Sequence, residues 1–194
     1  MKKIFFLPGL EKTLIKVFNE DFQNEQLLEI EKGENENEKI FDFFKKNDLK
    51  LEEIAEIFFC NGPGRFMSMR ISAVIANLFK NQNSSIKLFS ISTVKFFAMK
   101  TQNLVPIFLQ LNNSEIFTLI NGEEKVYLRG DLEKKFLGEE KIFYFGNLKK
   151  GLFDFENFEK IDVKKILPDE KILQNISKNG EKFLTQQVKI FYGK

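Results

Sequence analysis

One junction between a strand and a helix restricts the fold of this chain more than any other segment. The run Ile57-Phe58-Phe59-Cys60 is apolar on both faces, as a strand in the interior of a sheet is. It ends at Asn61-Gly62-Pro63-Gly64, and apolar residues then recur with helical spacing from residue 65 or 66. The sequence therefore predicts an α/β fold built around a buried strand.

The segments on either side of this junction predict two similar lobes. A hairpin-rich start and a βαβα stretch form the first, and a second set of hairpins, with Asn121-Gly122 as a turn signal, forms the other. We expect a first lobe at residues 1–101 and a smaller, truncated second lobe at residues 102–194, hinged near residues 101–104. Residues 31–38, rich in Glu and Asn, are expected to form a solvated loop. Predicted strands cover residues 4–7, 14–18, 26–30, 57–60, 86–91, 105–111, 115–120, 126–129, 142–145 and 188–192, and predicted helices cover residues 40–47, 51–54, 66–79 and 92–99.

The charge balance argues against a free-standing nucleic-acid binder. The 30 basic and 28 acidic side chains leave a net charge of +2, whereas phosphate contacts need a clustered basic face. The pairs Lys149-Lys150 and Lys164-Lys165 have acidic neighbours and no aromatic platform, so we interpret them as solvated surface.

The absence of histidine excludes several kinds of catalytic site. Ser-His and Cys-His dyads and His-ligated metal sites cannot form without it, although carboxylates, lysine or tyrosine could still act. The single cysteine, Cys60, excludes an internal disulfide and fits a reducing cytoplasm. Only four apolar residues precede Pro8, too few for a signal peptide, and no apolar helix approaches the roughly 20 residues that span a membrane. We expect a cytoplasmic protein without catalytic residues, cofactor or metal.

Two predicted helices carry more apolar surface than one core needs. Between residues 71 and 79 no side chain is charged, whereas a surface helix keeps about half of its circumference polar. In the helix before it, Phe41 points away from the face formed by Ile40, Phe43 and Phe44. The chain contains 24 Phe, so one spare Phe is a weak signal, but two such helices together indicate a surface for a helical partner.

Residue spacing suggests which face of the second helix meets that partner. One apolar arc is expected to face the sheet and consists of Met67, Ile71, Val74 and Leu78. The remaining arc is made of small residues, which would let another helix approach closely. The predicted partner-binding residues are Phe41, Phe44, Met69, Ser72, Ala73 and Ala76.

The turn Gly62-Pro63-Gly64 with Arg65 is the other candidate binding element. Two glycines permit a sharp turn with positive φ and leave helix amides uncovered, which could hold an anion or contact a partner. The same residues can equally serve only to turn the chain, and Arg65 and Arg70 could pair with carboxylates instead of phosphate. No lysine followed by Ser or Thr comes after the second glycine, so this is not a Walker loop.

Residues 57–71 taken together resemble the TsaB family, whose pattern there is an apolar strand, Gly-Pro-Gly-Ser-Phe-Thr-Gly, and then Arg-Ile. Residues 89–93, 111–117, 143–147 and 189–192 resemble later family segments in the same order. The resemblance implies an actin-like fold of the sugar-kinase and Hsp70 type, with two RNase-H-like lobes of mixed sheets flanked by helices.

The resemblance also implies partners and a function. Family members pair through helices of the first lobe with the larger catalytic subunit TsaD, and with the small ATPase TsaE. That assembly installs threonylcarbamoyl on the adenosine next to the anticodon of certain tRNAs. This chain would then be a non-catalytic scaffold that meets tRNA only through the complex, and the same helices could pair two copies of the isolated chain.

Departures from the family pattern bear on nucleotide binding. Phe6-Leu7-Pro8-Gly9 stands where the family begins with Ile-Asp-Thr-Ser, whose acidic and hydroxyl groups orient nucleotide phosphates and magnesium in active members of the superfamily. Residues 65–68 are bulkier and more basic than the family's Ser-Phe-Thr-Gly, and residues 112–114 lack its Asp and Arg. The alternative function is an actin-like-fold enzyme, either a small-molecule kinase, against which Leu7 and Pro8 argue, or a peptidase with a Ser-Lys or carboxylate mechanism.

Overall fold

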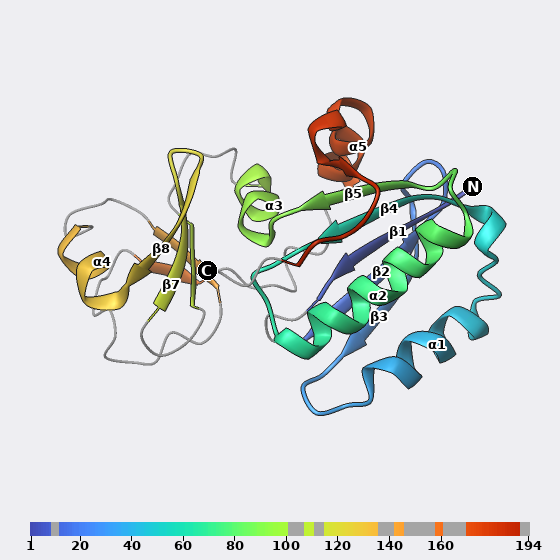
Figure 1. The fold of residues 1–194 in the computed structure, drawn as a ribbon, viewed down its shortest axis with the longest axis horizontal. Helices are drawn as coiled ribbons and strands as arrows, with labels where there is room; N and C mark the ends of the chain where they lie inside the picture. Colours follow the sequence, from blue (N-terminus) through green and yellow to red (C-terminus); the bar gives the residue numbers. More distant parts are fainter. Residues whose placement is uncertain are drawn as a thin grey trace.

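Two sheets with helices on their faces make up the structure, a computed structural model that describes residues 1–8, 12–100, 107–110, 115–135, 142–145, 158–160 and 170–190 (Figure 1). The strands of the first sheet are β1 (Lys2–Leu7), β2 (Thr13–Phe18), β3 (Asn24–Ile30), β4 (Ile54–Cys60), β5 (Lys87–Ile91) and β11 (Leu184–Thr185). Those of the second are β6 (Ile107–Gln110), β7 (Glu115–Ile120), β8 (Glu123–Leu128), β9 (Ile142–Phe145) and β10 (Phe158–Lys160). The helices are α1 (Glu36–Lys46), α2 (Phe66–Gln82), α3 (Thr93–Lys100), α4 (Arg129–Lys135) and α5 (Glu170–Asn179), with 3-10 turns η1 (Leu51–Glu53) and η3 (Glu181–Phe183).

The two sheets repeat one topology, which confirms the predicted fold of two RNase-H-like lobes. In the first sheet β1, β2 and β3 form an antiparallel meander, and β4 and β5 add parallel strands on the other side of β1. In the second sheet β6, β7 and β8 form the meander, and β9 and β10 add the parallel strands beside β6. The strand orders are β11-β5-β4-β1-β2-β3 and β10-β9-β6-β7-β8.

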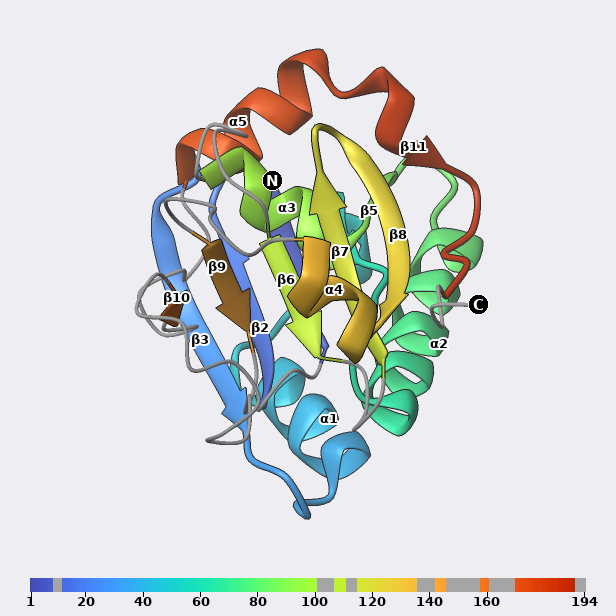
Figure 2. The same cartoon turned by 90° about the vertical axis from the view of Figure 1, so that its left-hand side faces the viewer.

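Alternating side chains along the first sheet build a core on each of its faces. Ile4 and Phe6 of β1 pack on the side that α1 and α2 cover, whereas Phe5 and Leu7 pack on the side of α3 and α5. Strand β4 alternates in the same way and is buried on both faces, which confirms the prediction made from its sequence. Helix α3 carries the second core across to the other sheet, where Phe97 shares a cluster with residues of β6 and β7 (Figure 2).

The C-terminal part of the chain returns to the first lobe, although the predicted boundary assigned residues 102–194 to the second. Strand β11 pairs antiparallel with β5, and Leu173 and Ile176 of α5 join the core around Phe5 and Phe58. Residues 188–190 do not form the strand predicted at residues 188–192, and the last two of those positions lie outside the described residues. Residues 188–190 lie beside α2 instead, where the side-chain oxygen of Asn77 accepts a hydrogen bond from the Val188 N–H at 2.7 Å.

One predicted helix begins earlier in the structure than expected, and one predicted hairpin is confirmed. Helix α1 begins at Glu36, within the predicted loop of residues 31–38, because Asn35 caps it by accepting a hydrogen bond from the Glu38 N–H. The predicted hairpin at Asn121-Gly122 is confirmed, and both turn residues have positive φ. The predicted hinge at residues 101–104, and residues 112–114, lie outside the described part of the chain.

Within the ranges that the structure describes, no helix is both long enough and apolar enough to cross a membrane.

Candidate functional site

One face of helix α2 packs against the first sheet, and the other face is exposed to solvent. Its buried residues are Ser68, Met69, Ser72, Ala73, Ile75 and Ala76. The predicted choice of face is therefore wrong, because three members of the arc expected on the sheet, Met67, Val74 and Leu78, are exposed. Small side chains let the helix backbone approach the strands closely, and the longer Met69 and Ile75 fill the remaining space.

The six predicted partner-binding residues divide between surface and interior. Phe41 of α1 is on the surface, with 55% of its side chain area exposed. The other five are buried within this chain, so they contribute to its own core: Phe44, Met69, Ser72, Ala73 and Ala76.

The exposed face of α2 is itself strongly apolar. Phe66, Met67, Val74 and Leu78 are all large and exposed, and helical spacing places them on one arc. Arg70 lies within that arc, with its guanidinium carbon 5.2 Å from the centre of the Phe66 ring. We call Phe66, Met67, Val74 and Leu78 the exposed apolar face; Phe41 is an exposed apolar side chain on the neighbouring α1. The predicted excess of apolar helix surface thus exists, on the side of α2 opposite to the one expected.

The loop before α2, residues 61–65, is held by a backbone hydrogen bond and by an ion pair. Gly62 has φ of +114°, a conformation that favours glycine, and its carbonyl accepts a hydrogen bond from the Thr93 N–H at 2.8 Å. The Gly62–Pro63 peptide bond is cis, and both residues are buried. Arg65, at the N-cap position of α2, makes an ion pair with Glu36 at 2.7 Å. This arginine therefore pairs with a carboxylate of its own chain, one of the two roles that the sequence left open.

Glu36 is a functional candidate that the sequence reasoning missed. Its side chain is buried, and one carboxylate oxygen accepts hydrogen bonds from Arg65, from the Thr13 hydroxyl at 3.0 Å and from the Ser68 hydroxyl. The chain thus supplies its own anion at the N-terminus of α2. A signal was present in Asn35 and Glu38, which have the spacing of a capping box and would have placed Glu36 in the first turn of a helix.

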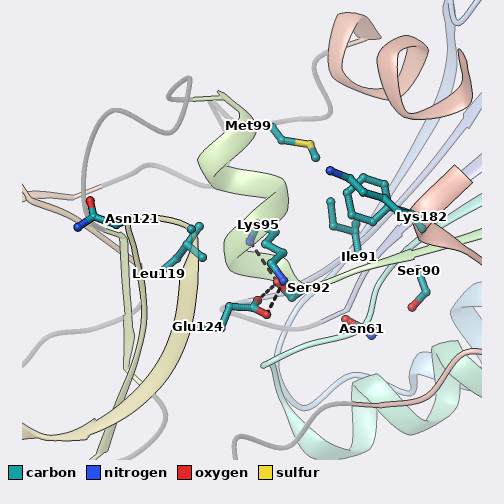
Figure 3. A pocket seen from close by; sticks show the side chains of 12 residues that line it. Asn61, Ser90, Ile91, Ser92, Lys95, Met99, Leu119, Asn121, Glu124 and Lys182 are labelled. Carbon is teal, nitrogen blue, oxygen red and sulfur yellow. Dashed lines mark hydrogen bonds and ion pairs between the residues drawn. The ribbon is translucent and has the colours of Figure 1, made fainter. Parts of the chain in front are cut away.

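A cleft of about 750 Å³ separates the lobes at the C-terminal ends of β4 and β5 (Figure 3). Ser92 and Lys95 of the first turn of α3 face Glu124 of β8 from across the cleft. Glu124 accepts a hydrogen bond from the Ser92 hydroxyl and an ion pair from Lys95 at 2.8 Å. The Ser92 hydroxyl also accepts a hydrogen bond from the Lys95 N–H at 3.2 Å, so Ser92 caps the N-terminus of α3. These contacts tie the second lobe to α3.

The remaining groups around the cleft are a mixture of polar and apolar side chains. Asn61 Oδ1 and Ser90 Oγ are buried and have no hydrogen-bond partner among the described residues, and Leu119 and Phe183 add apolar side chains to the lining. Cys60 lies just before Asn61, and burial raises the pKa of its thiol well above the usual value, so the thiol stays protonated at neutral pH. Among the described residues, no three His, Cys, Asp or Glu side chains are grouped as metal ligands would be.

Comparisons with known proteins support the resemblance at the level of the fold. No protein-family model matches the chain, and no curated protein does. A crystal structure of an uncharacterised Pseudomonas aeruginosa protein, described as similar to the peptidase YeaZ, aligns with a TM-score of 0.68 and 14% identity over 100% of this chain and 99% of that one. The structure of YeaZ from Pseudomonas aeruginosa aligns with a TM-score of 0.53 and 14% identity over 74% of each chain. This chain therefore has the fold of these YeaZ-like proteins.

Proposed function

We propose that this chain is a non-catalytic scaffold subunit of the cytoplasmic complex that installs threonylcarbamoyl on the tRNA adenosine next to the anticodon. It pairs with a TsaD-like catalytic subunit through α1 and α2, and meets a TsaE-like ATPase and tRNA only within that assembly. The exposed apolar face is the observation that carries the proposal. The fold shared with YeaZ, a TsaB homologue, and the family resemblance of residues 57–71 support it.

The exposed apolar face has the composition of a protein interface. Fully burying a side chain such as Val, Leu, Phe or Met stabilises by about 1.5–3 kcal/mol, so several together can offset the cost of association. Arg70 adds a guanidinium beside an aromatic ring, and arginine and aromatic side chains are enriched at the centres of interfaces. A helical partner with a matching apolar stripe and an acidic group opposite Arg70 would fit this surface.

Co-purification with a TsaD-like protein tests the proposal. Val74→Asp combined with Leu78→Asp should abolish the complex, because two carboxylates would be buried at the interface without partners. Asn175→Asp combined with Asn179→Asp is the matched control, since it adds the same two charges at exposed positions of α5, on the other face of the first sheet, and should leave binding intact. Retention of the complex by the double variant would show that α2 is not the docking helix.

The alternative function, an actin-like-fold kinase, would use the inter-lobe cleft and can be tested directly. The cleft lies at the C-terminal ends of parallel strands, where ligands of open α/β sheets bind. Calorimetry of the isolated chain with magnesium and ATP should detect no binding if the chain is only a scaffold. Tight binding, or turnover of a small phosphate acceptor, would favour the kinase instead.

A further inference from the structure

We propose that Glu36 is a positioning residue that locks the first turns of α1 and α2 together and thereby fixes the exposed apolar face. The lock itself is a property of the isolated chain, whereas its effect on a partner rests on the function proposed above. The inference starts from the cluster of Glu36, Thr13, Arg65 and Ser68.

The geometry brings three elements to one carboxylate. Helices α1 and α2 lie side by side and begin at the same end of the first lobe (Figure 1). Glu36 is the first residue of α1, and its Oε1 atom accepts from Arg65 at 2.7 Å and from the Ser68 hydroxyl, both in the N-terminal region of α2. Thr13, the first residue of β2, donates to the same oxygen at 3.0 Å. A single side chain therefore connects two helices and the sheet beneath them.

Electrostatics explains why this carboxylate is tolerated in a buried position. A helix N-terminus is partly positive, and α2 has no acidic residue in its first turn and no side-chain cap at Arg65. Glu36 supplies that negative charge from the neighbouring helix, and Arg65 balances it. Buried charges are stable only when they are paired and hydrogen-bonded, so removal of either Glu36 or Arg65 leaves the other uncompensated.

The position of the cluster links it to the exposed apolar face. Phe66 and Met67 lie between Arg65 and Ser68 in the sequence, so the backbone that carries them is held at both ends by Glu36. At the opposite end of the helix pair, the Phe44 and Phe79 rings meet with their centroids 5.5 Å apart. The helix pair is thus joined by polar contacts at its N-terminal end and by aromatic rings near its C-terminal end.

Glu36→Gln tests the lock in the isolated chain, with Glu38→Gln as control. Both changes remove one negative charge from the first turn of α1, but Glu38 is exposed and Glu36 is buried. Glu36→Gln should speed hydrogen exchange of the amides of residues 69–72, the first of α2 with helical acceptors, by about tenfold more than it speeds those of β1 and β4, as expected when a close charged pair is uncoupled. Unchanged exchange at residues 69–72, or equal acceleration in both variants, would overturn the proposal.

Variants of Arg65 provide a second, independent test of the lock. Arg65→Gln should accelerate the same amides, Arg65→Lys should restore most of their protection because it keeps the positive charge, and Glu36→Gln with Arg65→Gln should be no worse than either alone. A double variant whose effects simply add would contradict the lock, since the two residues would then act separately.

Binding to the TsaD-like protein extends the test to the partner. At a temperature well below the unfolding midpoint of every variant, Glu36→Gln should raise the dissociation constant by about fivefold to tenfold, whereas Glu38→Gln should bind as the unmodified chain does. Exchange that changes without any loss of affinity would overturn the effect on the partner. If the unmodified chain fails to bind at all, the proposed function falls, and the exchange measurements still decide whether Glu36 locks the helices.

Discussion

Both faces of α2 are apolar, but one packs against the first sheet and the other is exposed to solvent. The buried face combines Ser and Ala with Met69 and Ile75 and lies against the first sheet, whereas the exposed face carries Phe66, Met67, Val74 and Leu78. Side-chain size, more than polarity, separates them. A face of small residues packs closely on strands, and a face of large, exposed side chains has the reach to fill pockets in another protein.

The sharpest way to break this comparison is to place the same charge on each face. Ala76→Asp puts a carboxylate at a position that is 0% exposed and should destabilise the chain by about 4 kcal/mol or more, because no group there can pair with it. Val74→Asp, at 66% exposure, should change stability by less than about 1 kcal/mol. Urea unfolding followed by circular dichroism measures both. Equal losses would show that the exposed face also supports the fold.

Helix α1 offers the next largest contrast through two phenylalanines. Phe44 is buried between Phe43 and Phe79, so Phe44→Ala should leave a cavity and cost about 3 kcal/mol. Phe41→Ala should cost less than about 1 kcal/mol because the side chain is already exposed, but it should weaken binding to a TsaD-like protein. Thermal unfolding and a binding titration on the same samples separate the two effects. A stability loss at Phe41 as large as that at Phe44 would contradict the assignment.

The smallest expected effects distinguish two serines on the buried face. Ser68 donates a hydrogen bond to Glu36, so Ser68→Ala should cost about 1 kcal/mol. Ser72 is fully buried, and its hydroxyl has no hydrogen-bond partner in the part of the chain that the structure describes, so Ser72→Ala should leave stability unchanged or raise it by up to about 1 kcal/mol. Calorimetry should therefore show a lower unfolding midpoint for Ser68→Ala and an equal or higher midpoint for Ser72→Ala. A loss at Ser72 equal to that at Ser68 would reveal a contact that the structure lacks.

Much of the fold follows from local patterns in the sequence. The apolar run at residues 57–60 and the turn after it predict β4 and α2, and the turn signal at Asn121-Gly122 predicts the pairing of β7 with β8. These elements are determined by neighbouring residues, so periodicity and turn chemistry are sufficient. The return of α5 and β11 to the first sheet is different. This segment is polar, and β11 pairs with β5, which lies more than 90 positions earlier in the chain. No local sequence pattern specifies such a distant partner.

The site was only partly predictable, for two physical reasons. Both arcs of α2 are apolar, so hydrophobic spacing could not select the buried one, and the close approach allowed by Ser72, Ala73 and Ala76 decided it. Glu36 looked like one more acidic residue in a polar stretch. Its burial depends on Arg65 and Ser68, which lie about 30 positions away and meet it only in the folded chain.

The pairing of β11 with β5 also sets an order of events during synthesis. One side of the first sheet, with Phe5, Phe58 and Phe89, is covered in part by α5, whose residues leave the ribosome after nearly all of the second lobe has been made. A nascent chain that has reached only residue 101 therefore leaves part of this aromatic side uncovered, because α3 packs on only the remainder. Translation must pass residue 185 before the first sheet can close, so this sheet is completed only after the second lobe has been made.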